Sequence, residues 1–126
     1  KSIDTVVASN LHADILTDLA ASLSGSMGIA PTANLDPDKR HPSMFEPIHG
    51  SAFDIMGKGI ANPIGSYWSA VMMLENLGEL QAAQKLMFAI EKLTADKKVL
   101  PKDLGGTSTT KQITKAMKDI ISGKNN

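Results

Sequence analysis

The chain has 126 residues, of which 42% are hydrophobic and 21% are charged, and its formal net charge is zero. This balance is typical of one globular domain and argues against disorder, while the neutral charge and an aromatic content of 4% argue against a nucleic-acid or membrane surface. The lack of cysteine excludes disulfides and thiolate metal sites and is compatible with the cytoplasm, and no apolar run reaches the roughly 20 residues that span a bilayer.

The first part of the chain predicts a strand and then a helix. The β-branched run at residues 5–8 is typical of a buried strand. Ser9 and Asn10 then offer an N-cap for a helix within residues 10–24. Apolar side chains recur on one face of this helix at Leu11, Ile15, Leu19 and Leu23. Because the chain enters a strand at once, without an initiator Met or a signal peptide, we expect a longer parent protein.

The middle of the chain combines short strands with a long loop. Residues 27–35 are apolar but contain proline, which favours an irregular or edge strand. A polar loop at 36–43 and a short strand at 44–48 follow. Residues 49–62 carry three glycines and show no sustained periodicity. Loops of this length in compact domains tend to be functional.

The last part predicts three helices. Pro63 opens a helix that runs to about Leu77, and a second helix spans 79–98. The core face of the second helix is predicted at Ala83, Leu86, Met87, Ile90 and Leu93. After a connector, a capping box at Thr109 and Gln112 begins the final helix, with an apolar face at Ile113, Met117, Ile120 and Ile121 and an end at Gly123.

Asp14 and Asp18 are the first candidate site. Their spacing places both carboxylates on one helix face, where like charges repel. A hard cation such as Mg²⁺ or Mn²⁺ would relieve this repulsion and leave positions open for substrate oxygens. The alternative is that early acidic residues simply complement the helix dipole, and the spacing alone leaves both interpretations open.

The second candidate site is the loop 45–63. Glycines let a ligand approach the backbone closely, and His49 offers stacking or hydrogen bonding. Asp54 could accept hydrogen bonds from two ribose hydroxyls and would repel a 2′-phosphate. A plain surface loop, in which Asp54 caps a turn and His49 is solvated, is equally compatible with the composition.

Taken together, four segments resemble the isocitrate/isopropylmalate dehydrogenase family of β-decarboxylating dehydrogenases. They are SNLHADILTDL at 9–19, GIAPTAN at 28–34, FEPIHGSAFDIMGKGIANP at 45–63 and DLGGT at 103–107. They cover nearly the whole chain in order. The segment at residues 7–10 and the loop before Phe45 are most similar to the corresponding segments in the branch of tartrate and D-malate dehydrogenases.

The resemblance implies an α/β fold, a mixed sheet flanked by helices that is not a Rossmann fold, of which residues 1–126 would be the C-terminal portion. It implies Mg²⁺ or Mn²⁺ on Asp14 and Asp18, and a 2-hydroxy dicarboxylic acid that is oxidised by NAD and then decarboxylated. Glu46 would lie near the nicotinamide, and Asp54 would bind the adenosine ribose. The adenosine would be surrounded by His49, Gly50, Ser51, Ala52, Ile55 and Asn62. NAD is expected because NADP-dependent relatives carry Lys-Tyr in place of Asp54-Ile55.

Two segments depart from the family pattern. The pair His12-Ala13 replaces Phe-Gly or Asn-Gly, and we interpret His12 as a helix-surface residue. Phe53 replaces the usual proline before Asp54, which is expected to reshape the ribose corner. Neither change removes a predicted ligand.

The chain lacks the substrate-binding and proton-transfer groups that the reaction requires. Arg40 is the only arginine, and Tyr67, the only tyrosine, is expected in the core beside Trp68. The resemblance places the catalytic residues and a further metal ligand upstream, so none is assigned here and the chain alone is expected to be inactive. It also implies a homodimer with a shared active site. The rival hypotheses are a 3-isopropylmalate dehydrogenase and a non-catalytic nucleotide-binding subunit.

Overall fold

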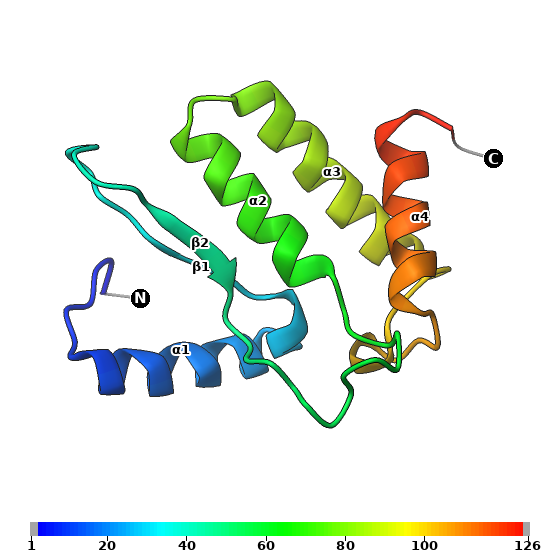
Figure 1. Ribbon diagram of the computed structural model, residues 1–126, viewed down its shortest axis with the longest axis horizontal. Coiled ribbons are helices and arrows are strands. Elements are labelled where there is room, and N and C mark those ends of the chain that lie inside the picture. The colour runs from blue at the N-terminus through cyan, green and yellow to red at the C-terminus, as the bar shows by residue number, and fades with distance from the viewer. Residues whose placement is uncertain (1–2, 125–126) are drawn as a thin grey trace.

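The computed structural model describes residues 3–124 and has an α/β architecture. Within them, four α-helices accompany one two-stranded sheet (Figure 1). In chain order the elements are α1 (Asn10–Leu23), the 3-10 turn η1 (Met27–Ile29), β1 (Pro31–Asn34), β2 (Met44–Pro47), α2 (Ile64–Asn76), α3 (Leu80–Asp96), the 3-10 turn η2 (Lys102–Leu104) and α4 (Thr110–Ile121). The predicted order of the helices and of the middle strands is therefore confirmed.

The core lies between α2, α3 and α4, which stand side by side (Figure 1). Its buried side chains are Ile64, Val71, Ala83, Ala89, Ile90, Leu93, Ile113 and Met117. The apolar faces predicted for the last two helices are confirmed, because their other members, Leu86, Met87, Ile120 and Ile121, pack against this cluster. Tyr67 and Trp68 also pack against it, as expected.

The small sheet joins the core to the N-terminal helix. β1 and β2 are antiparallel, with Thr32 opposite Glu46 and Ala33 opposite Phe45. α2 contacts both strands and η1. The contact is close at Gly65, where an added Cβ would lie 3.0 Å from the carbonyl oxygen of Gly28 and 3.3 Å from Cβ of Pro47. A glycine on α2 thus lets the helix approach the backbone of the segment that follows α1.

The start of α4 and the end of α2 follow the predicted capping chemistry, whereas the Ser9 side chain makes no capping hydrogen bond to α1. The side chain of Thr109 accepts a hydrogen bond from the backbone of Gln112, and the Gln112 side chain accepts one from the backbone of Thr109, which completes the capping box of α4. Gly78 follows α2 with φ 84°, a conformation that favours glycine. The predicted end of the second helix was slightly late, because Lys97 already has the left-handed φ of 54°.

One prediction at the N-terminal end was wrong. Residues 5–8 form no strand, and Val7 is 97% exposed, because no strand among the described residues pairs with this segment. The apolar face of α1 is also uncovered, with Leu11 66% and Leu23 82% exposed. In Figure 1, α1 lies apart from the other three helices, so its amphipathic face has no partner in the core.

None of the helices within residues 3–124 is both long enough and apolar enough to cross a bilayer.

Candidate functional site

The two carboxylates lie on an unbroken stretch of α1. Because Asp14 and Asp18 are four residues apart within this helix, they share one face. Asp14 is exposed and Asp18 half-buried. Among residues 3–124, neither carboxylate takes part in a salt bridge or a side-chain hydrogen bond. A carboxylate pair without a protein cation beside it fits a hard divalent ion.

This pair is an incomplete ligand set. In the described part of the chain, no group of three or more His, Cys, Asp or Glu side chains is arranged to hold a metal ion. His12 lies near the pair in sequence, but its Nδ1 shares a hydrogen bond of 2.8 Å with the hydroxyl of Ser9, and the residue is exposed. The chain therefore supplies two metal ligands at most from this helix face.

The predicted cofactor loop begins on the sheet. Glu46 is exposed on β2, and the backbone N–H of Ile48 donates to the carbonyl of Ala30 (3.0 Å), which fixes the start of the loop beside β1. The loop then makes consecutive turns, with the N–H of Ile55 donating to Ala52 (3.0 Å) and that of Lys58 donating to Ile55 (3.1 Å). The long loop predicted for this region is confirmed.

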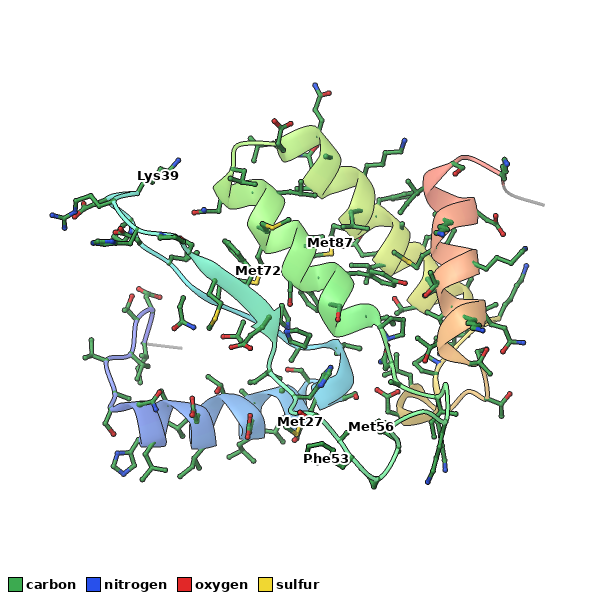
Figure 2. The ribbon with its side chains drawn as sticks, in the orientation of Figure 1. Met27, Lys39, Phe53, Met56, Met72 and Met87 are labelled. Atoms are coloured by element: carbon green, nitrogen blue, oxygen red, sulfur yellow. The ribbon has the colours of Figure 1, made fainter. Side chains whose placement is uncertain are left out.

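The predicted cofactor residues form an open surface. Besides Glu46, five of them are exposed, namely His49, Gly50, Ser51, Ala52 and Asp54, while Ile55 and Asn62 are half-buried. An added Cβ at Gly50 would meet nothing within 4 Å, so a ligand could reach the backbone there. Ala52 has the left-handed φ of 44°, which is uncommon for a residue with a Cβ. Phe53, 79% exposed, and Met56 extend from the same loop (Figure 2).

The end of the loop is held by α4. The backbone N–H of Thr110 donates to the carbonyl of Gly59 (2.9 Å), and the Thr110 hydroxyl donates to the carbonyl of Ala61 (2.5 Å). The first residue of α4 thus fixes the loop backbone shortly before α2 begins. Sequence reasoning missed this role of Thr110, because nothing local connects a helix start to a loop 49 residues away.

A second anchor for the loop end is a carboxylate from the connector. Oδ2 of Asp103 accepts hydrogen bonds from the Asn62 side-chain amide (2.9 Å) and from the Ser26 hydroxyl (2.5 Å). The Ser26 hydroxyl in turn accepts from the N–H of Gly28 (2.9 Å). Of these residues, only Asn62 was among the predicted site residues. Asp103 was noted only as part of the segment 103–107, and Ser26 lies outside the four segments that carry the resemblance.

No hydrogen bond or ion pair in the described residues joins the carboxylates of Asp14 and Asp18 to the loop. The one arginine and the one tyrosine of the sequence make contacts away from both predicted sites. Arg40 pairs with Asp38 (2.6 Å) in the exposed connection between β1 and β2. The Tyr67 hydroxyl donates to Thr114 (2.7 Å) beside the core.

A groove of about 410 Å³ lies in a different place. Its walls are mainly apolar, and they are formed by Ile29, Ile64, Trp68, Met87, Ile90, Glu91, Thr94, Lys97, Leu100 and Leu104. It contains none of the predicted metal or cofactor residues. The candidate site is therefore defined by the carboxylates of α1 and by the loop, and this groove is not part of it.

Comparison with known proteins connects these features to one family. The model of the isocitrate/isopropylmalate dehydrogenase family matches residues 1–121. A probable tartrate dehydrogenase/decarboxylase of Agrobacterium vitis is 60% identical over 125 residues, which are 99% of this chain and 35% of the relative. The decarboxylating D-malate dehydrogenase of Escherichia coli K12 is 49% identical over 123 residues, with coverage of 94% and 34%.

Solved structures agree with the sequence match. The crystal structure of an isocitrate dehydrogenase from Methylococcus capsulatus superposes with a TM-score of 0.83 at 39% identity, covering 89% of this chain and 33% of that one. A β-decarboxylating dehydrogenase from Thermococcus kodakarensis gives 0.78 at 38% identity, with coverage of 90% and 32%. The predicted fold class is confirmed, and the chain spans about a third of the length of the relatives it matches.

Proposed function

The chain belongs to the isocitrate/isopropylmalate dehydrogenase family, and from this premise we propose that its protein catalyses the metal-dependent, NAD-linked oxidation and decarboxylation of a 2-hydroxy dicarboxylic acid of the tartrate or D-malate type. The observation that carries the proposal is the combination, in one chain, of an uncompensated carboxylate pair on α1 and an open, anchored loop. The names of the relatives, tartrate dehydrogenase/decarboxylase and D-malate dehydrogenase, support the reaction class.

Asp14 and Asp18 would hold Mg²⁺ or Mn²⁺, with further ligands from substrate and from other parts of the protein. When bound, the cation supplies Lewis-acid stabilisation of the negative charge that develops during decarboxylation, and NAD accepts the hydride. The exposed position of Asp14 leaves its carboxylate accessible to such an ion. The two carboxylates would bind the cation directly and would in this way help to orient the substrate.

The loop would bind the dinucleotide. Asp54 is exposed, so its carboxylate can accept hydrogen bonds from both ribose hydroxyls and would repel a 2′-phosphate. The other predicted contacts, from His49 to Ala52 with Ile55 and Asn62, would surround the adenosine, and Glu46 on β2 would face the nicotinamide side. We propose NAD in preference to NADP for this reason.

The proposal extends to a homodimer in the cytoplasm, with an active site shared between subunits. The described residues offer no free arginine fork or general acid–base pair, since Arg40 and Tyr67 are engaged as described. Other parts of the protein or a second subunit would have to supply these groups. We therefore expect no turnover from the 126-residue chain by itself.

The test is NAD reduction by the intact protein with Mn²⁺ and, in parallel, D-malate, tartrate and 3-isopropylmalate. We expect turnover with D-malate or tartrate, little with NADP, and loss of activity in Asp14→Asn and Asp18→Asn. Asp119→Asn, which changes an aspartate of α4 paired with Lys115, is the matched control. Preference for 3-isopropylmalate would support the alternative that the protein is a 3-isopropylmalate dehydrogenase. NAD binding without turnover of any substrate would support the alternative of a non-catalytic nucleotide-binding subunit.

A further inference from the structure

Asp103 joins three segments that are far apart in sequence. Its Oδ2 atom accepts hydrogen bonds from Ser26, 77 residues away, and from Asn62, 41 residues away. Ser26 lies just before η1, Asn62 is the next-to-last residue of the loop 45–63, and Asp103 belongs to η2. One carboxylate oxygen of the connector before α4 thus binds both the segment after α1 and the Asn62 side chain of the loop.

The Asn62 side chain is held at both of its ends. Its Nδ2 donates to Asp103 (2.9 Å), and its Oδ1 accepts from the backbone N–H of Ile64 (2.9 Å) at the start of α2. These two contacts determine which end of the amide is the oxygen and which way its plane faces. An NH₂ group has two N–H donors, so one donor of Asn62 remains after the bond to Asp103. Its direction is set by the position of the Asp103 carboxylate.

The loop backbone is fixed by a different residue. Thr110 binds the carbonyls of Gly59 and Ala61, whereas the only contact that Asp103 makes with the loop is its hydrogen bond from the Asn62 side chain. Removal of the Asp103 carboxylate should therefore leave the path of the loop intact and leave the Asn62 amide held only at its Oδ1 end, by the N–H of Ile64. This division of roles makes the orientation of one side chain separable from the structure of the loop.

We propose that Asp103 is a positioning residue for dinucleotide binding, acting through Asn62. It holds the Asn62 amide so that its remaining donor and its plane are oriented toward the adenosine part of a nicotinamide dinucleotide before the ligand arrives. Such preorganisation raises affinity because the side-chain entropy is lost on folding and not on binding. The inference rests on the proposed function, since it assumes that the loop binds NAD(H).

The test is a fluorescence titration of NADH into the intact protein and its variants. Asp103→Ala is expected to weaken NADH binding about tenfold, in keeping with the loss of one charge-assisted hydrogen bond. Asp103→Asn, which keeps a carbonyl oxygen able to accept from Asn62, is expected to recover most of the affinity. Asp119→Ala, on the far end of α4, removes a carboxylate without touching the loop and serves as the control.

A double-mutant cycle separates positioning from general loss of structure. If Asp103 acts through Asn62, Asp103→Ala weakens binding in the wild-type background but changes nothing further in Asn62→Ala. An equal additional loss in the Asn62→Ala background would overturn the proposal. The ¹⁵N-labelled side-chain amide of Asn62, followed by NMR without ligand, provides a second readout, and we expect its signals to shift and broaden in Asp103→Ala while the backbone signals of residues 59–61 stay in place.

The possible failures are distinguishable. If wild type binds NADH and Asp103→Ala binds equally well, the positioning role is wrong and the proposed function stands. If wild type binds no NADH under any of these conditions, the proposed function fails and the role of Asp103 in dinucleotide binding fails with it. If Asp103→Ala disturbs the backbone signals of the whole loop, Asp103 is structural, and the positioning role is again refuted.

Discussion

Gly28 and Asp103 lie so close that a side chain at position 28 would occupy the place of the carboxylate. A Cβ added to Gly28 would be 2.5 Å from Oδ2 of Asp103 and 3.1 Å from Nδ2 of Asn62. The backbone of Gly28 is not in the left-handed region, so the glycine is required here for space and not for conformation. The Asp103 network can form only because position 28 has no side chain.

Gly28→Ala should therefore force Asp103 away from its two donors. We expect the free energy of unfolding to fall by about 1 to 2 kcal/mol, since hydrogen bonds to a charged group are lost, and NADH binding to weaken as it does in Asp103→Ala. Urea denaturation measures the first effect. Gly50→Ala is the matched control because its Cβ would meet nothing within 4 Å, and equal destabilisation by both variants would contradict this account.

Two N-cap residues should respond differently to alanine. Thr109 caps α4 through its side chain, in a complete capping box, whereas the side chain of Ser9 makes no capping hydrogen bond to α1. We expect Thr109→Ala to lower the free energy of unfolding by about 1 kcal/mol and Ser9→Ala to lower it by much less. Thermal unfolding monitored by circular dichroism tests this difference. A larger loss of stability in Ser9→Ala than in Thr109→Ala would contradict the capping contacts described for the two helices.

The hydroxyl of Thr110 should stabilise the end of the loop. Thr110→Val keeps the shape of the side chain and the backbone bond to Gly59 but removes the bond to the Ala61 carbonyl. We expect a loss of about 1 kcal/mol and faster amide exchange near residues 59–62. Thr107→Val, a change at an exposed threonine of the connector, is the control. Unchanged exchange near the loop would mean that α4 does not hold it.

Ile113 should be the most sensitive position of α4. It is fully buried, at 0% exposure, among side chains of α2 and α3. Ile113→Ala removes three carbons from this site and should cost about 2 to 5 kcal/mol in unfolding free energy. Leu80→Ala, at a leucine that is 57% exposed, should cost far less. A cost below about 1 kcal/mol for Ile113→Ala would indicate that the helices do not pack as described.

The metal hypothesis makes a prediction for stability as well as activity. If Asp14 and Asp18 bind Mn²⁺ in the folded state, saturating Mn²⁺ should raise the melting temperature of the intact protein by linkage. Asp14→Asn should lose most of this increase. Its metal-free form should be at least as stable as wild type, because a repulsive pair at i,i+4 has been removed. Asp119→Asn should keep the full increase; retention of the increase by Asp14→Asn would place the ion elsewhere.

Local patterns predicted the helices, the capping box at Thr109 and the long loop because each depends on neighbours within a few residues. The same reasoning failed at residues 5–8. Their β-branched composition favours a strand, but a strand also needs a paired neighbour, and none of the described strands lies beside this segment. The apolar face of α1 was visible in the sequence, whereas its exposure depends on what other elements cover it.

The candidate site divides in the same way. The i,i+4 spacing of Asp14 and Asp18 and the composition of the loop can be read directly from the sequence. Helix geometry alone places the two carboxylates on one face. The contacts of Asp103 with Ser26 and Asn62, and the clearance at Gly28, arise only when segments 41 and 77 residues apart pack together. No local propensity encodes such distances, because they depend on how the connector, the loop and the turn after α1 pack around the start of α2.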